Sequence, residues 1–132
     1  TMRSRPSMAQ SALDAAVAYL KAKGYGRIAL VSHSMGSRMD HAYMLKNPAD
    51  VHAWVSMGIP ATQSYAGIKA PVLDLYGAKD LDVVLAGAAK RKNSLKGHAA
   101  SKQIVIPDAD HFFGDHEAAM VKAVKDYLDG VK

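Results

Sequence analysis

The feature that most constrains the fold of this chain is the alternation of short apolar runs with segments of helical periodicity. Four apolar runs have the length and composition of buried strands: residues 27–31, 51–57, 71–76 and 102–106. Four segments around them repeat apolar residues at helical spacing: residues 11–23, 36–45, 81–92 and 116–128. The alternation predicts an α/β fold, a three-layer α/β/α sandwich around a short parallel sheet of about four strands with right-handed crossovers.

Size and composition are those of one small globular domain, expected to span residues 1–132. A chain of this length buries roughly two-thirds of the surface that its unfolded form exposes, so a hydrophobic core is feasible. The sequence has no cysteine, which excludes disulfides, thiolate metal ligands and a cysteine nucleophile. The histidines have no metal-ligand spacing with carboxylates or with one another, so we expect no metal and no cofactor.

The net charge of +5 raises the question of an acidic partner. Lys and Arg residues are scattered along the chain, and the one dense cluster is Lys90, Arg91, Lys92 and Lys96. No aromatic residue is interleaved with this cluster, which is therefore typical of a solvated helix end rather than of a nucleic-acid site. We expect no nucleic-acid partner.

The location of the protein is predicted from its apolar runs and its first residues. No apolar run approaches the ~20 residues that a membrane span needs, and residues 1–10 lack the apolar core of a signal peptide. These features predict a soluble protein without a membrane span and favour the cytoplasm. Because Thr1 precedes Met2, the removal of a leader stays open, and with it a periplasmic or secreted location.

Candidate chemistry centres on the sequence Ser32-His33-Ser34-Met35-Gly36, which joins the first apolar run to a helical segment. A strand–turn–helix junction with a serine at its apex is the pattern of a nucleophile elbow, where a sharp turn lifts the serine hydroxyl above the sheet. The usual pattern has glycine in place of Ser32, but serine is small enough for the turn. The helix N-terminus that follows favours negative charge nearby. Ser34 is therefore the candidate nucleophile, and the Met35 N–H a candidate oxyanion donor.

A serine nucleophile needs a base and an orienting acid, and both residue types follow later apolar runs. Asp80 follows the run 71–76, and His111 follows the run 102–106. The carboxyl ends of parallel strands meet at one edge of a sheet, so Ser34, Asp80 and His111 should lie together there. Three neighbouring aspartates stay open as alternatives for the acid: Asp82, Asp108 and Asp110.

Other residues near these motifs have weaker indications. Ile59 and Tyr65, in the loop after the second strand, and Phe112, beside the candidate base, are predicted walls of an acyl pocket. His33 is expected to pack against or orient its neighbours rather than to react. Asp74 is unusual inside a strand, and we expect it to be hydrogen bonded in a structural role.

With these motifs in place, the chain resembles the C-terminal half of an α/β-hydrolase of the serine esterase or lipase type. Three segments carry the resemblance, which covers nearly the whole chain: residues 27–36, 70–80 and 104–113. The run 71–76 looks most like a poorly characterised bacterial branch of that superfamily. The resemblance implies a carboxylic-ester hydrolase that works through an acyl-enzyme, with Ser34 as nucleophile, His111 as base and Asp80 as orienting acid.

The chain departs from a full family member in its length. About four strands that precede the nucleophile strand in the family have no room here, and one of their loops carries an oxyanion N–H. A side chain or an N–H of residues 58–62 is left open as the replacement. The loop 59–69 is too short for a cap domain, so we expect an open site for short-chain or accessible, including polymeric, esters. A non-catalytic binding or assembly module and a piece of a longer hydrolase are the alternatives.

The same departure places the nucleophile strand at the edge of the sheet. An exposed apolar edge strand is a liability that proteins normally cover or pair. We therefore expect a homodimer, formed through that edge or through the neighbouring helices.

Overall fold

The computed structural model describes residues 8–47 and 50–131, and its elements follow the predicted alternation. In chain order they are α1 (Met8–Ala22), β1 (Ala29–His33), α2 (Met35–Lys46), β2 (Ala53–Met57), β3 (Val72–Gly77), α3 (Asp82–Leu85), α4 (Ala88–Ser94), β4 (Lys102–Ile106) and α5 (Glu117–Gly130). The expectation about a leader concerns residues 1–7, which lie outside the described residues. The predicted α/β class and the four predicted strands are confirmed.

The four strands form one sheet in the order β1-β2-β3-β4, and all neighbouring strands are parallel. Strands β2 and β3, in the middle of the sheet, are buried at nearly every position, whereas the edge strands β1 and β4 have several exposed positions. Burial of the central strands is expected because parallel sheets are covered on both faces. The parallel arrangement places the carboxyl ends of all four strands along one edge of the sheet.

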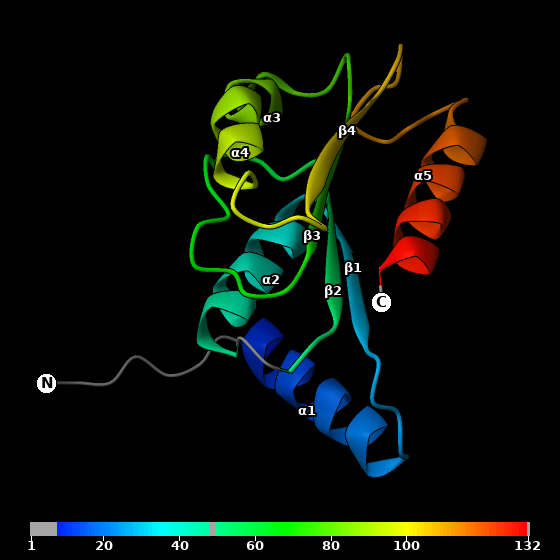
Figure 1. Ribbon diagram of the computed structural model, residues 1–132. Coiled ribbons are helices and arrows are strands. Elements are labelled where there is room, and N and C mark those ends of the chain that lie inside the picture. The colour runs from blue at the N-terminus through cyan, green and yellow to red at the C-terminus, as the bar shows by residue number, and fades with distance from the viewer. Residues whose placement is uncertain (1–7, 48–49, 132) are drawn as a thin grey trace, which may run out of the picture.

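Helices cover both faces of this sheet, as Figure 1 shows. Helix α5 packs on one face, and α1, α2, α3 and α4 lie on the other side. Strand β2 illustrates the division. Trp54 packs into the core beneath α1 and α2, whereas Ala53 and Val55 pack toward α5 with Tyr127. This alternation is the consequence of the two-residue period of a strand that is buried on both faces.

The segment predicted as one helix over residues 81–92 forms two short helices instead, α3 and α4, with a break at Gly87. A Cβ atom on Gly87 would lie 2.4 Å from the carbonyl oxygen of Thr62 and 2.8 Å from Nη1 of Arg91. The break therefore lies where the backbone of the loop after β2 packs directly against Gly87. Helical periodicity contains no information about this contact with a distant part of the chain.

A row of polar side chains crosses the sheet from edge to edge. Register pairs Ser32 with Ser56, Ser56 with Asp74, and Asp74 with Gln103. Directly paired residues of neighbouring strands point to the same face, here the face beneath α2 and α4. Tyr65 satisfies the middle of the row, since its hydroxyl donates to Asp74 Oδ1 at 2.6 Å and lies 3.0 Å from Ser56 Oγ. Burial, together with the Asp74 carboxylate, raises the pKa of Tyr65 well above its usual value.

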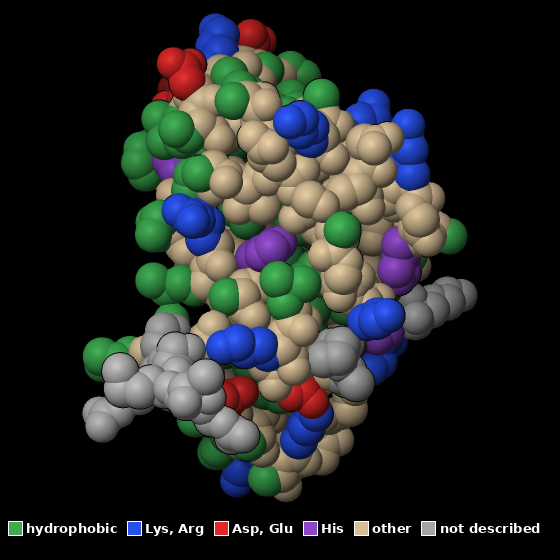
Figure 2. Space-filling view, turned by 90° about the vertical axis from the view of Figure 1, so that its left-hand side faces the viewer, with side chains coloured by type: hydrophobic (Ala, Val, Ile, Leu, Met, Phe, Trp, Pro, Cys, Tyr) green, Lys and Arg blue, Asp and Glu red, His purple; other side chains and the backbone are tan. Residues whose placement is uncertain are grey.

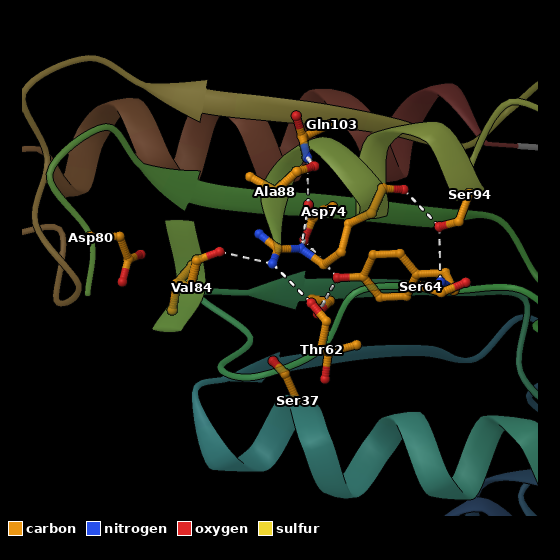
Figure 3. Close-up of polar contacts among 12 residues, drawn as sticks. Ser37, Thr62, Ser64, Asp74, Asp80, Val84, Ala88, Ser94 and Gln103 are labelled. Carbon is orange, nitrogen blue, oxygen red and sulfur yellow. Dashed lines mark hydrogen bonds and ion pairs between the residues drawn. The ribbon is translucent and has the colours of Figure 1, made fainter. Parts of the chain in front are cut away.

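Arg91 completes this network, which is drawn in Figure 3. Its side chain is fully buried, and Nε donates to the two carboxylate oxygens of Asp74 at 3.1 and 3.0 Å. Nη1 donates to the carbonyl oxygens of Thr62 and Val84 at 3.1 and 2.9 Å. Gln103 Nε2 donates to Asp74 Oδ2 at 2.9 Å. One buried ion pair thus connects β3, β4, α3, α4 and the loop after β2, and Asp74 has the structural role predicted for it.

We expect the substitution Arg91→Met to reduce the free energy of unfolding by about 3–5 kcal/mol, because it leaves the Asp74 carboxylate buried without its charge partner. The double variant Asp74→Leu/Arg91→Met should lose less than the single variant, since no uncompensated charge remains. Lys125→Met is the control, because its ion pair with Asp129 is exposed and should contribute little to the free energy of unfolding. Urea unfolding measures all three, and equal losses for Arg91→Met and Lys125→Met would contradict the expectation.

The burial of Arg91 corrects one expectation about the basic cluster. Lys90, Lys92 and Lys96 are exposed, as a solvated helix end requires, but Arg91 is buried and pairs with Asp74. Figure 2 shows Lys and Arg side chains spread over one face of the molecule. No helix among the described residues is long and apolar enough to cross a lipid bilayer.

The edge strand β1 borders an apolar surface. Val31, in the centre of the strand, is 50% exposed. A groove of about 370 Å³ runs between this strand and α5, and its lining is largely apolar: Val31, Met57, Met120, Val121, Val124, Lys125, Leu128 and Asp129. An open strand edge beside an apolar groove is a surface that proteins normally cover.

Homodimer formation through this edge stays a prediction. Size-exclusion chromatography with light scattering should give about twice the chain mass of 14.1 kDa. Val31→Lys should shift the mass toward the monomer, because it places a charge on the paired edge. Val105→Lys is the matched control, since Val105 is exposed on β4, the opposite edge. A mass of 14.1 kDa for the unsubstituted chain at every concentration would contradict the dimer.

Candidate active site

The carboxyl edge of the sheet brings Ser34, Asp80 and His111 into one hydrogen-bonded chain. Ser34 follows β1, Asp80 follows β3 and His111 follows β4. His111 Nε2 lies 2.9 Å from Ser34 Oγ, and His111 Nδ1 lies 2.7 Å from Asp80 Oδ1. An ionised carboxylate can only accept, so Nδ1 carries the proton and Nε2 accepts from the serine hydroxyl. Such an arrangement can transfer the serine proton to the imidazole.

Ser34 lies in a strained turn between β1 and α2. Its φ of 58° and ψ of −124° belong to a region that residues other than glycine rarely adopt, at a cost of about 1–3 kcal/mol. Its N–H donates to the Met57 carbonyl at 2.8 Å, and its own carbonyl accepts from the Ser37 N–H at 3.0 Å. These bonds tie the turn to β2 and to the first turn of α2. The strain is therefore held by the surrounding sheet and helix.

Ser32, which stands where the usual motif has glycine, has partners for its hydroxyl. Trp54 Nε1 donates to Ser32 Oγ at 2.9 Å, and the hydroxyl also bonds to the Asp40 carboxylate. Burial raises the pKa of Asp40, and the bond from Ser32 opposes that rise. The sequence argument for Ser32 was its size alone. Its polar contacts arise from residues on α2 and β2 that only the fold brings to it.

Asp80 is the aspartate that bonds to His111, and both side chains are buried. Besides the imidazole, Asp80 Oδ1 accepts from the Leu81 N–H at 2.7 Å, and Oδ2 accepts from the Gly77 N–H at 3.4 Å. Backbone donors therefore hold both carboxylate oxygens. A carboxylate fixed in this way can keep the imidazole in one orientation and stabilise its protonated form.

The three alternative aspartates lie elsewhere. Asp82 is exposed in the first turn of α3. Asp108 forms an exposed ion pair with Lys79, with 3.7 Å between Nζ and Oδ1. Asp110 Oδ1 accepts from the Phe112 N–H at 2.9 Å. Asp110 therefore shapes the loop that carries the histidine, and sequence proximity to that histidine was no guide to the residue that contacts its ring.

Two glycines give the Asp–His pair its room, and the sequence analysis missed both roles. Gly58, with a φ of 57°, ends β2 against the imidazole. A Cβ atom there would lie 3.1 Å from His111 Cε1 and Nδ1 and 3.4 Å from Asp80 Oδ2. At Gly77, a Cβ atom would lie 2.2 Å from the Ala109 carbonyl oxygen. A glycine directly after each of two predicted strands was the available signal.

The substitution Gly58→Ala should lower the free energy of unfolding by about 1–3 kcal/mol, because it adds backbone strain and crowds the His111 ring. Gly36→Ala is the matched control. Gly36 is helical, and its added Cβ would meet only Ser32 Cβ at 3.9 Å, so we expect no loss or a gain of up to about 1 kcal/mol. Denaturant unfolding measures both variants. Equal stabilities would show that the contact at Gly58 is unimportant.

The predicted pocket walls are divided between the core and the surface. Ile59 is fully buried and Tyr65 is 3% exposed, since the Tyr65 hydroxyl turns inward to Asp74. Neither presents its side chain as the wall that the sequence predicted. Phe112 is 75% exposed. Ser34 is partly exposed and lines neither the groove beside α5 nor the hollow of about 630 Å³ beside α4.

Backbone N–H groups are the donors near the serine. Met35 is the first residue of α2, so its N–H lies at the positive end of the helix dipole. In the loop after β2, the N–H groups of Gly58 and Ala61 already donate to carbonyl oxygens, and the proline between them has none. Ile59 and Thr62 are the remaining sources of a second N–H there. Among the described residues, no group of three or more His, Asp and Glu side chains is placed to hold a metal ion.

Comparison with known proteins finds similarity in structure rather than in sequence. Neither a protein-family model nor a curated protein matches the chain. A protein of unknown function from Agrobacterium tumefaciens, a suggested α/β-hydrolase, matches with a TM-score of 0.79 and 15% identity over 98% of this chain and 62% of that one. A predicted CIB-like hydrolase from Thermoplasma acidophilum matches with a TM-score of 0.71 and 22% identity, over 92% of this chain and 60% of that one. A structure from a study of carboxylesterases of Nitrososphaera gargenis matches with a TM-score of 0.73 and 12% identity, over 99% of this chain and 78% of that one.

These similarities show the fold. The chain has part of the α/β-hydrolase fold, as the resemblance in the sequence implied. It spans 62% and 60% of the length of the first two structures. A fold supports many chemistries, so the function has to be argued from the site itself.

Proposed function

We propose that the chain is a serine hydrolase that cleaves carboxylic esters through Ser34, His111 and Asp80. The observation that carries the proposal is the continuous hydrogen-bonded chain, with distances of 2.9 Å from serine to imidazole and 2.7 Å from imidazole to carboxylate. The strained backbone of the serine supports it, because such strain is concentrated at functional sites. The structural similarity to the protein from the study of Nitrososphaera gargenis carboxylesterases also supports it.

In the first half of the proposed reaction, Ser34 Oγ attacks the ester carbonyl carbon while His111 Nε2 takes the hydroxyl proton. Asp80 accepts from Nδ1–H throughout, which keeps the accepting tautomer in place and stabilises the imidazolium. His111 then gives its proton to the alkoxy oxygen as the ester C–O bond breaks. The alcohol leaves, and the acyl group remains bonded to Ser34.

In the second half, water attacks the acyl carbon while His111 Nε2 takes a proton from it. The bond from the acyl carbon to Ser34 Oγ breaks, and the imidazole returns its proton to that oxygen. The carboxylic acid is released and the site is restored. No metal or cofactor enters any of these steps.

Negative charge on the carbonyl oxygen needs donors that are in place before the reaction. The Met35 N–H, at the start of α2, is the proposed first donor, supported by the helix dipole. Loss of one such donor costs ~10²–10³ in rate in a well-studied protease, so a second donor matters. We assign that role to an N–H of the loop after β2, at Ile59 or Thr62.

The proposed substrates are short-chain or accessible esters, including polymeric ones. The support is the open surface around Ser34, where the neighbouring Met35 is 54% exposed and Phe112, beside His111, is 75% exposed. Both side chains offer apolar contact without enclosing a substrate. An exposed site of this kind admits an ester that projects from a larger molecule.

The test is hydrolysis of p-nitrophenyl butyrate by the chain and by Ser34→Ala. We expect the variant to lose at least about 10³-fold in kcat, because it removes the nucleophile. Asp80→Asn should lose about 10⁴-fold through the wrong imidazole tautomer. Asp82→Asn is the matched control and should keep the full rate, because Asp82 is exposed and the aspartate that bonds to the imidazole is Asp80. Equal rates for the unsubstituted chain and Ser34→Ala would rule out the proposal.

A non-catalytic binding or assembly module is the second candidate. The apolar groove beside the open β1 edge favours it. In that case the hydrogen-bonded serine, histidine and aspartate would only stabilise the carboxyl edge of the sheet. Ser34→Ala would then change the stability of the chain and leave hydrolysis at background.

A further inference from the structure

The strongest unused contact near the site belongs to His33, the last residue of β1. His33 Nε2 lies 2.8 Å from the backbone carbonyl oxygen of His111. A carbonyl oxygen can only accept, so Nε2 carries a proton and donates it. The contact joins His33, which directly precedes Ser34, to the backbone of His111, whose ring bonds to the Ser34 hydroxyl.

The two imidazoles also lie against each other. Their centroids are 4.7 Å apart, with 36° between the planes. Phe112 and Phe113 flank the His33 ring with centroids at 6.0 and 6.3 Å. His33 is therefore packed into the loop after β4 as well as hydrogen bonded to it, which limits the rotation of both rings.

The loop that carries His111 needs such a tether. Three of its non-glycine residues have positive φ: Asp108, Phe113 and Asp115. Short turns of this kind are held by local bonds, such as those from the Phe113 N–H to the Asp110 carbonyl and from the His116 N–H to the Phe113 carbonyl. These bonds shape the loop internally, and the Lys79 N–H, which donates to the Ala109 carbonyl at 2.9 Å, ties the loop to the segment after β3. The bond from His33 ties the backbone of the loop to β1.

We propose that His33 is a positioning residue. Its Nε2–H holds the backbone of His111 in place, and the His111 ring is thereby kept with its own Nε2 within hydrogen-bond distance of Ser34 Oγ. The expected effect of His33 on kcat rests on the proposed hydrolase function. The expected effect of His33 on the position of His111 rests on geometry alone.

The experiment compares His33→Leu, which removes the donor, with His33→Gln, whose side-chain N–H₂ can reach a similar position. With p-nitrophenyl butyrate, His33→Leu should lose about 10- to 100-fold in kcat with KM within about twofold, since a misplaced base slows the chemical step. His33→Gln should recover most of that loss. His41→Leu is the matched control and should leave kcat unchanged, because His41 Nε2 makes the same kind of contact elsewhere, with the Ser64 carbonyl at 2.9 Å in the loop after β2.

A second readout does not depend on activity. Nitrogen-15 NMR of the imidazoles should show the His111 signals shifted or broadened in His33→Leu, restored in His33→Gln and unchanged in His41→Leu. If His33→Leu does not fold, His33→Asn takes its place, because its shorter amide cannot reach the carbonyl.

The outcomes separate this inference from the proposed function. If Ser34→Ala matches the unsubstituted chain in rate, the hydrolase proposal fails, and the NMR comparison alone decides the role of His33. If Ser34→Ala is inactive while His33→Leu keeps the full kcat and unchanged His111 signals, the positioning role is overturned. Equal losses in His33→Leu and His33→Gln would also overturn it, because the donor would then have no specific effect.

Discussion

The buried ion pair between Asp74 and Arg91 connects most of the parts that surround the candidate site. Asp74 lies in the middle of the sheet, where an unpaired carboxylate would be costly, and its donors come from β4, α4 and the loop after β2. Because a half-satisfied network is worse than an apolar core, these elements are expected to dock together or not at all. Two residues that lie against the His111 ring adjoin elements of this network. Asp80 precedes α3, and Gly58 begins the loop after β2.

The candidate site depends on backbone geometry more than on a pocket. Parallel pairing brings the ends of β1, β3 and β4 to one edge, and the positive φ of Ser34 directs its hydroxyl toward the imidazole. Gly58 lets the His111 ring approach β2, and His33 ties the backbone of that residue to β1. Each constraint acts on a main-chain position. Asp80 and His111 are buried and Ser34 is partly exposed, so the hydrogen-bonded chain meets solvent at its serine end.

The edge of β1 that does not pair with β2 is open. Within the described part of the chain, β1 pairs with β2 alone, and its Val31 lines the groove beside α5. A surface of this kind gains from being covered, and the site lies at the end of the same strand. A strand that paired with β1 would therefore lie beside Ser34.

The sequence by itself determined the order of strands and helices, the apolar strand before Ser34, and the presence of an aspartate and a histidine after later strands. These are local patterns, set by the period of side chains along a strand or helix and by turn residues. Only the tertiary structure decided that Asp80 rather than Asp110 contacts the imidazole, that Arg91 leaves the basic cluster for the core, and that Tyr65 turns inward instead of lining a pocket. The physical reason is common to all three. Each outcome depends on a buried charge or hydroxyl finding its partner on a distant segment, and periodicity along the chain contains no information about that partner.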